Sequence, residues 1–137
     1  MSNLLLDTCA VVWIGMGETI DKAAMEQINE AYHEDGKVCM SPITAWELAA
    51  LANKERIRLA RSVLDWFESF AAQDGITMTL LSPRILVNSW ELPGTPPNDP
   101  ADRIMISTAR TLNLSIVTRD KPILDYSSQG HVQAIHC

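Results

Sequence analysis

Four acidic side chains stand at points of the sequence where their charges would meet. Asp7 ends the first apolar run of the chain, and Asp120 follows the last strong apolar run. Glu47 interrupts an apolar helical stretch, and Asp102 falls in the first turn of a later helical pattern. If these elements build a parallel sheet, all four acids converge on one crevice at its carboxyl edge, where open α/β folds bind ligands.

Carboxylates gathered in one crevice repel each other unless protons or cations neutralise them. Oxygen-only ligands favour Mg²⁺ or Mn²⁺ over zinc. Such a cation lowers the pKa of a water that attacks phosphorus, and it stabilises the leaving oxygen. The sequence therefore predicts nuclease chemistry with Mg²⁺ or Mn²⁺ as the cofactor.

Each acid also has a structural interpretation. Asp7 would cap the helix that follows it, and Asp120 would be a turn residue. Asp99 and Asp102 would form a closure like a capping box at the start of a helix. Glu47 is the hardest to explain in this way, because a carboxylate rarely stays on an apolar helix face without a partner.

Short apolar runs alternate with helical patterns along the chain. Strands are predicted over residues 4–7, 37–40, 76–81 and 114–118, with a fifth edge strand over 131–135. Helices are predicted from about Cys9 and over residues 25–34, 41–53, 60–73, 82–94 and 99–113. This alternation predicts a single domain over residues 1–137, a three-layer α/β/α sandwich around a mainly parallel sheet of four to five strands.

Composition narrows the class of protein. The 137 residues are 47% hydrophobic and 20% charged, as in a globular protein. The net charge of −6 is unusual for a nucleic-acid binder, but bound cations would offset it locally. The three cysteines predict reduced thiols, in the core or, for Cys137, in an exposed tail. No signal peptide and no apolar run of about 20 residues is evident, so we expect a cytoplasmic protein with no membrane contact.

Four segments together resemble PIN-domain ribonucleases, and specifically the VapC-type toxins of toxin–antitoxin pairs. They are residues 4–8, 41–49, 98–109 and 117–120, and they occur in the family's order over nearly the whole chain. The resemblance implies a PIN-like fold and an acidic quartet that holds Mg²⁺ or Mn²⁺ and activates water: Asp7, Glu47, Asp102 and Asp120.

The resemblance also assigns supporting roles. Thr8 and Thr118 would hydrogen-bond the acids, and Asp99 would be an auxiliary acid at the rim. Asn98 departs from the family, which often has His at this position, so the pH optimum or substrate fit would differ. The likeness further implies a homodimer, an RNA substrate that is often transfer RNA, arrest of translation and growth, and a VapB-type antitoxin that blocks the site.

Other residues have weaker interpretations. A basic run could grip phosphates or be a solvated helix junction: Lys54, Arg56, Arg58 and Arg61. The four tryptophans are assigned to the core or to helix interfaces, rather than to base stacking: Trp13, Trp46, Trp66 and Trp90. The three histidines lie in no ligand spacing and are read as incidental: His33, His131 and His136.

Three alternatives compete with the nuclease. A haloacid-dehalogenase-type phosphatase needs a second Asp two residues after the first, where this chain has Cys9. A response-regulator receiver domain needs an acidic pair near the end of the first strand and a phosphorylated Asp on a middle strand, and neither is evident. A catalytically silent PIN-like interaction module would have no need to keep all four acids.

Overall fold

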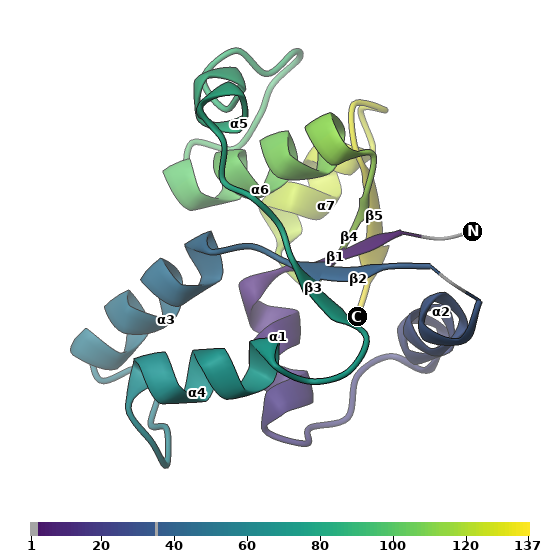
Figure 1. Cartoon of the computed structure of the whole chain (residues 1–137). Coiled ribbons are helices and arrows are strands. Elements are labelled where there is room, and N and C mark those ends of the chain that lie inside the picture. Colours follow the sequence, from purple (N-terminus) through teal and green to yellow (C-terminus); the bar gives the residue numbers. More distant parts are fainter. Residues whose placement is uncertain (1–2, 35) are drawn as a thin grey trace.

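The computed structural model describes residues 3–34 and 36–137, which form five strands and seven helices (Figure 1). The strands are short: β1 (Leu4–Leu6), β2 (Val38–Met40), β3 (Ile76–Met78), β4 (Ser115–Thr118) and β5 (Gln133–His136). All neighbouring strands pair in parallel, in the order β3-β2-β1-β4-β5. The prediction of a mainly parallel sheet of four to five strands is confirmed, with five strands present.

The strand order creates a ligand-binding position. From β1 the chain moves outward through β2 to β3, and it then returns to β4 on the other side of β1. The direction of winding therefore changes between β1 and β4. In open α/β sheets, ligands bind outside the carboxyl ends of the strands at such a switch point.

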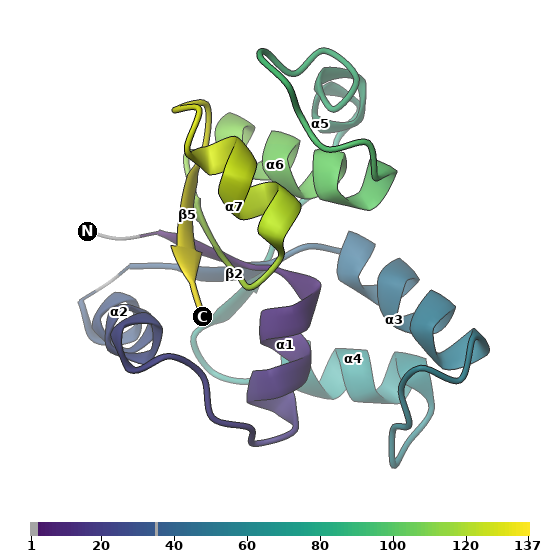
Figure 2. The same ribbon diagram turned by 180° about the vertical axis from the view of Figure 1, so that it is seen from behind.

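Helices cover both faces of the sheet (Figures 1 and 2). They are α1 (Thr8–Gly15), α2 (Lys22–His33), α3 (Ile43–Asn53), α4 (Val63–Ala71), α5 (Pro83–Asn88), α6 (Pro100–Leu112) and α7 (Lys121–Ser127). Successive strand residues point to opposite faces, so Leu4 and Leu6 belong to one buried cluster with α1, α2 and α4, and Leu5 belongs to the other with α6 and α7. The three-layer sandwich is confirmed.

Several element boundaries differ from the prediction for identifiable reasons. The helix expected over 60–73 begins only at Val63, because Ser62 accepts a hydrogen bond from the Asp65 amide as its N-cap. The helix expected over 82–94 ends at Asn88. Tight turns follow it, and Pro93 prevents any further helix. The strand expected over 76–81 ends at Met78.

Two features were not anticipated at the end of the chain. Helix α7 follows Asp120 directly, where only a turn was predicted, and Asp120 is its N-cap. Cys137 is buried at 2% exposure instead of lying in an exposed tail, because its amide donates a hydrogen bond to the Thr118 carbonyl. Cys39 is buried as expected, and Cys9 is partly exposed.

Among the described residues, no helix has the length and apolar character needed to cross a bilayer.

Candidate active site

Asp7 occupies the switch point between β1 and β4. It follows β1, caps α1, and is only 6% exposed. Its Oδ1 accepts a hydrogen bond from the Thr8 amide at 2.9 Å, and its Oδ2 accepts one from the Thr118 hydroxyl at 2.6 Å. Burial raises the pKa of the Asp7 carboxyl, although these hydrogen bonds oppose the shift. The predicted capping role is therefore present, and it leaves the carboxylate beside the crevice.

Asp120 enters the same crevice from the end of β4. Its amide donates to the Thr118 hydroxyl at 2.9 Å, and its Oδ2 accepts from the Ile123 amide at 3.2 Å. The Thr118 hydroxyl therefore joins the two acids, because it accepts from Asp120 and donates to Asp7. Thr118 is fully buried, so this bridge is shielded from water.

Glu47 reaches the crevice from α3. Its Oε1 accepts a hydrogen bond from the Thr8 hydroxyl at 2.6 Å, and the same hydroxyl lies 3.1 Å from the Thr44 hydroxyl. Burial, helped by the charges of the neighbouring acids, raises the pKa of Glu47 to about 7, although the hydrogen bond from Thr8 opposes the shift. The apolar surroundings predicted for this carboxylate thus hold it partly out of water.

Asp102 completes the set from the first turn of α6. Asp99 caps this helix by accepting from the Asp102 amide at 2.9 Å, as the capping interpretation predicted. The Asp102 carboxylate makes no hydrogen bond to the described residues. Burial, together with repulsion from Asp120, Asp99, Asp7 and Glu47, raises its pKa to about 8. Asp99 is exposed at the rim, and neither it nor Asn98 lines the cavity.

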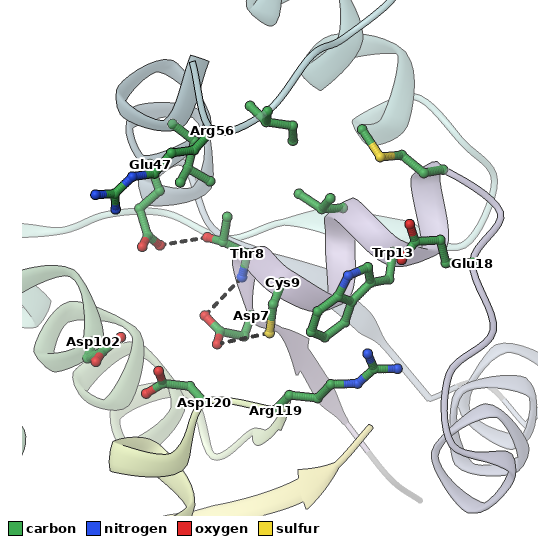
Figure 3. Close-up of a pocket in the computed structure, with 14 residues that line it drawn as sticks. Asp7, Thr8, Cys9, Trp13, Glu18, Glu47, Arg56, Asp102, Arg119 and Asp120 are labelled. Carbon is green, nitrogen blue, oxygen red and sulfur yellow. Dashed lines mark hydrogen bonds between the residues drawn. The ribbon is translucent and has the colours of Figure 1, made fainter. Parts of the chain in front are cut away.

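The four acids and Thr8 line one cavity of about 570 Å³ (Figure 3). The four acids come from four different elements and face a shared space, as the sequence predicted. The charges of the other acids add to the effect of burial in raising the pKa values of Glu47 and Asp102.

Among the described residues, none of these acids forms an ion pair with a basic side chain, although Arg56 and Arg119 line the same cavity. The one ion pair between acidic and basic side chains in residues 3–34 and 36–137 is Lys121–Asp125, on the surface of α7. In the same residues, no three Asp, Glu, His or Cys side chains are close enough, as they stand, to hold one metal ion. Hydrogen bonds hold Asp7, Glu47 and Asp120 in place, so side-chain rotation would be needed to gather three of them on an ion. The donor set of carboxylate oxygens with uncompensated charge nevertheless suits a hard divalent cation.

Sequence reasoning missed eight residues that line this cavity, among them Cys9, Arg119, Trp13 and a further acid, Glu18. The Cys9 thiol donates to Asp7 Oδ2 at 3.5 Å, and hydrogen bonding to Cys137 raises the pKa of Cys9, which keeps it a donor. Arg119 and Trp13 also line the cavity, and the guanidinium carbon of Arg119 lies 3.7 Å from the centroid of the indole. Arg119 stands between Thr118 and Asp120 in the sequence. Its position between two predicted site residues was the signal that could have identified it as part of the site.

The four residues of the predicted basic run lie in different places in the structure. Arg56 lines the cavity, whereas Lys54, Arg58 and Arg61 do not. Arg61 instead donates a hydrogen bond to the Ser69 hydroxyl at 2.6 Å, which fastens the loop to α4. Of these four basic residues, Arg56 alone is therefore positioned to contact a ligand in the acidic cavity.

The assignment of the tryptophans to the interior is wrong for two of them. Trp46 is 64% exposed and Trp90 is 70% exposed, whereas Trp66 packs against the core and stacks on Phe70. Trp13 packs against the core and also faces the cavity. None of the three histidines lines this cavity.

Comparison with known proteins agrees with the fold. A family model described as PIN domain matches residues 4–127. Ribonuclease VapC22 of Mycobacterium tuberculosis (strain ATCC 25618 / H37Rv) is 32% identical over 122 residues, which cover 88% of this chain and 89% of the relative.

Solved structures show the same fold. A chain in DNA-bound VapBC from Salmonella typhimurium aligns with a TM-score of 0.67 and 18% identity, over 99% of this chain and 98% of its own. A chain in VapBC2 from Rickettsia felis, bound to a promoter DNA fragment, aligns with a TM-score of 0.67 and 13% identity, over 97% of each chain. On the family match and the identity to VapC22, this chain belongs to the PIN-domain family, in its VapC-type branch.

Proposed function

We propose that this protein is a divalent-metal-dependent endoribonuclease that acts as the toxin of a toxin–antitoxin pair. It hydrolyses phosphodiester bonds in structured RNA, with transfer RNA as the expected target, and so arrests translation and growth. The observation that carries the proposal is the set of four carboxylates, which face one cavity and form no ion pair with a basic side chain of residues 3–34 and 36–137. Such a set is unfavourable in an isolated protein and is explained if a cation completes it.

In this proposal Asp7, Glu47, Asp102 and Asp120 hold one or two Mg²⁺ or Mn²⁺ ions. A cation held there supplies Lewis-acid activation of the phosphodiester and of the attacking water. The protein's own part is to aim the carboxylates: Thr118 orients Asp7 and anchors the start of α7, and Thr8 orients Glu47. Asp102 has no such orienting partner, so it is the acid most free to turn toward an ion.

Protonation links the site to pH. With pKa values of about 7 and about 8, Glu47 and Asp102 bind protons over part of the neutral range when no cation is present. A cation needs the deprotonated carboxylates and releases those protons when it binds. We therefore expect cation affinity to rise with pH through this range.

The partners are inferred from the relatives. VapC22 is named a ribonuclease, and the solved structures contain VapBC complexes. We therefore propose that a VapB-type antitoxin neutralises this chain, and that the chain forms the homodimer implied by the family. Cytoplasmic RNA would be its substrate.

The proposal is tested with purified protein, Mg²⁺ or Mn²⁺, and a transfer RNA pool. We expect cleavage that EDTA abolishes, and a loss of about 10²–10⁴-fold in rate for Asp7→Asn or Asp102→Asn. Expression of the wild type, but not of these variants, should arrest growth. Asp74→Asn, which removes an exposed acid outside the cavity, is the matched control and should cleave normally.

Undiminished cleavage by the cavity variants would refute the assigned residues. Absence of metal-dependent cleavage by the wild type, with antitoxin binding intact, would instead support the catalytically silent interaction module.

A further inference from the structure

The cavity that holds the acids extends into a second region, here called the apolar arm. It is formed by residues of α1, of the end of α3 and the loop after it, and by one residue before α7: Val12, Trp13, Met16, Leu51, Ile57 and Arg119. Figure 3 shows the Trp13 indole and the Arg119 side chain on one side of the cavity, with Asp102 on the other. The arm therefore continues from the catalytic acids without leaving the cavity.

Arg119 lies over the face of the Trp13 indole in this arm, so the two side chains form a fixed stack. The guanidinium carbon lies 3.7 Å from the centroid of the indole, well inside the range of a cation–π contact. Arg119 Nε donates to the Cys137 carbonyl at 2.9 Å, and its Nη2 donates to the Thr19 carbonyl at 3.1 Å. Both hydrogen bonds go to main-chain oxygens, and together they hold the guanidinium in place.

The two cations of the cavity lining occupy different places. Arg119 lies with Trp13 on one side of the cavity, and Arg56 lies beside Glu47 on the side of the four acids (Figure 3). Glu18 also lines the cavity, but it makes no ion pair with either arginine. A ligand suited to this arrangement carries negative charge beside a flat apolar group.

An unpaired nucleotide has this combination. Single-stranded loops present unstacked bases, and proteins bind such bases on aromatic rings and on arginine planes. A guanidinium is also the cation best suited to phosphate. A protein segment could fill the apolar part as well, but it would not explain a fixed aromatic–guanidinium surface beside the phosphate-cleaving acids.

We propose that the apolar arm binds an unpaired base of the RNA substrate, next to the phosphate that is cut. Trp13 and Arg119 provide the stacking surface, and Arg56 meets a neighbouring phosphate. This proposal rests on the ribonuclease function proposed above, and it makes Trp13 a substrate-positioning residue.

The test measures binding without cleavage. In an Asp7→Asn/Asp102→Asn background, fluorescence anisotropy follows binding of a labelled single-stranded RNA of eight adenosines. We expect Trp13→Ala to weaken binding about tenfold or more, and Trp13→Phe to stay within about threefold, because phenylalanine keeps an aromatic face. Indole fluorescence should be quenched on binding, and the quench should be lost in Trp13→Phe.

Two controls separate stacking from loss of structure. Trp90 makes a similar contact with Arg103, at 5.5 Å, but is 70% exposed and lies outside the cavity, so Trp90→Ala should bind like the parent. An RNA in which the bases are replaced by abasic sites leaves the protein unchanged, and it should bind the parent and Trp13→Ala equally and weakly.

The proposal is overturned if Trp13→Ala and the parent bind oligoadenylate equally, or if abasic RNA binds the parent as tightly as the intact RNA does. Either result would leave a protein segment as the occupant of the arm. Failure of the nuclease function is a separate result, because it would appear as absent cleavage by the wild-type protein.

Discussion

The four acids assigned to the site form two pairs that occupy different positions in the secondary structure. Asp7 and Asp120 follow strands, and each caps the helix that begins after it. Glu47 and Asp102 sit within helices and cap nothing. The first pair is used by the fold whether or not a cation is present. The second pair adds charge to a partly buried place, and its structural use is smaller: Glu47 accepts a hydrogen bond from Thr8, and Asp102 lies in the first turn of α6.

This difference changes how a site can be recognised. A capping role and a catalytic role are compatible, because a cap uses one oxygen and one orientation of the carboxylate. A structural explanation for a strand-end acid is therefore no argument against function. An acid without a structural use, placed where its pKa is raised, is the more specific indicator of function.

Among the tests of this difference between the pairs, the largest expected effect concerns the hydroxyl that links Asp7 and Asp120. Thr118→Val removes the donor to Asp7 Oδ2 and the acceptor for the Asp120 amide while keeping the side-chain shape. Losing a group that orients a metal ligand weakens cation binding by about 10–100-fold. Isothermal titration with Mn²⁺ would measure this directly.

Thr108→Val is the matched control for that experiment. Thr108 is equally buried, but its hydroxyl bonds to the Ile104 carbonyl of its own helix, outside the cavity. Equal Mn²⁺ affinity in the two valine variants would show that the Thr118 bridge has no part in holding a cation.

The sequence predicted the sheet, the layers and the meeting of the acids, because apolar runs and capping signals are local patterns. It did not predict α7, since seven residues are too few to display a helical period, and Asp120 was read as a turn. It also placed Trp46 and Trp90 inside, although both are largely exposed. Hydrophobicity indicates that a side chain favours burial, but the tertiary packing decides whether a place exists for it.

The cavity was predicted only in part for a related reason. The acids were recognised because charge stands out in apolar surroundings. Trp13 and Arg119 are far apart in the sequence and become neighbours only when α1 packs beside β4. Arg56 could not be distinguished from the other basic residues of its run, because their separation depends on the course of the loop after α3.

A smaller effect, on the free energy of unfolding, distinguishes the strand-end acids from the acids within helices. Asp120→Ala should lower the free energy of unfolding by about 1 kcal/mol relative to Asp120→Asn, because asparagine keeps the N-cap of α7 and alanine does not. At Asp102 the same comparison should show no loss for alanine, since that carboxylate caps nothing. Urea denaturation without metal measures both differences, and a cap-sized loss at Asp102 would contradict the distinction.

The smallest effect is the pH dependence of stability without metal, to which Glu47 and Asp102 contribute together with Asp7, whose pKa burial also raises. Glu47 and Asp102 have folded-state pKa values of about 7 and about 8, above the ordinary values of 4.5 and 3.8 expected in the unfolded chain. Between these limits the folded protein binds more protons than the unfolded one, so the free energy of unfolding falls as pH rises from about 4 to 8. Both groups are partly exposed, so we expect a decline of about 1 kcal/mol or less.

Urea midpoints in EDTA, compared between the wild type and Asp102→Asn, would reveal this decline. The two proteins should have similar pH dependence below about pH 4, where the carboxyl groups are neutral. They should separate as pH rises, because only the wild type must then bury the Asp102 charge. Added Mn²⁺ should reverse the trend in the wild type, since a bound cation stabilises the deprotonated form. Parallel curves in EDTA would mean that Asp102 is already well solvated, and the distinction between the two pairs of acids would then fail.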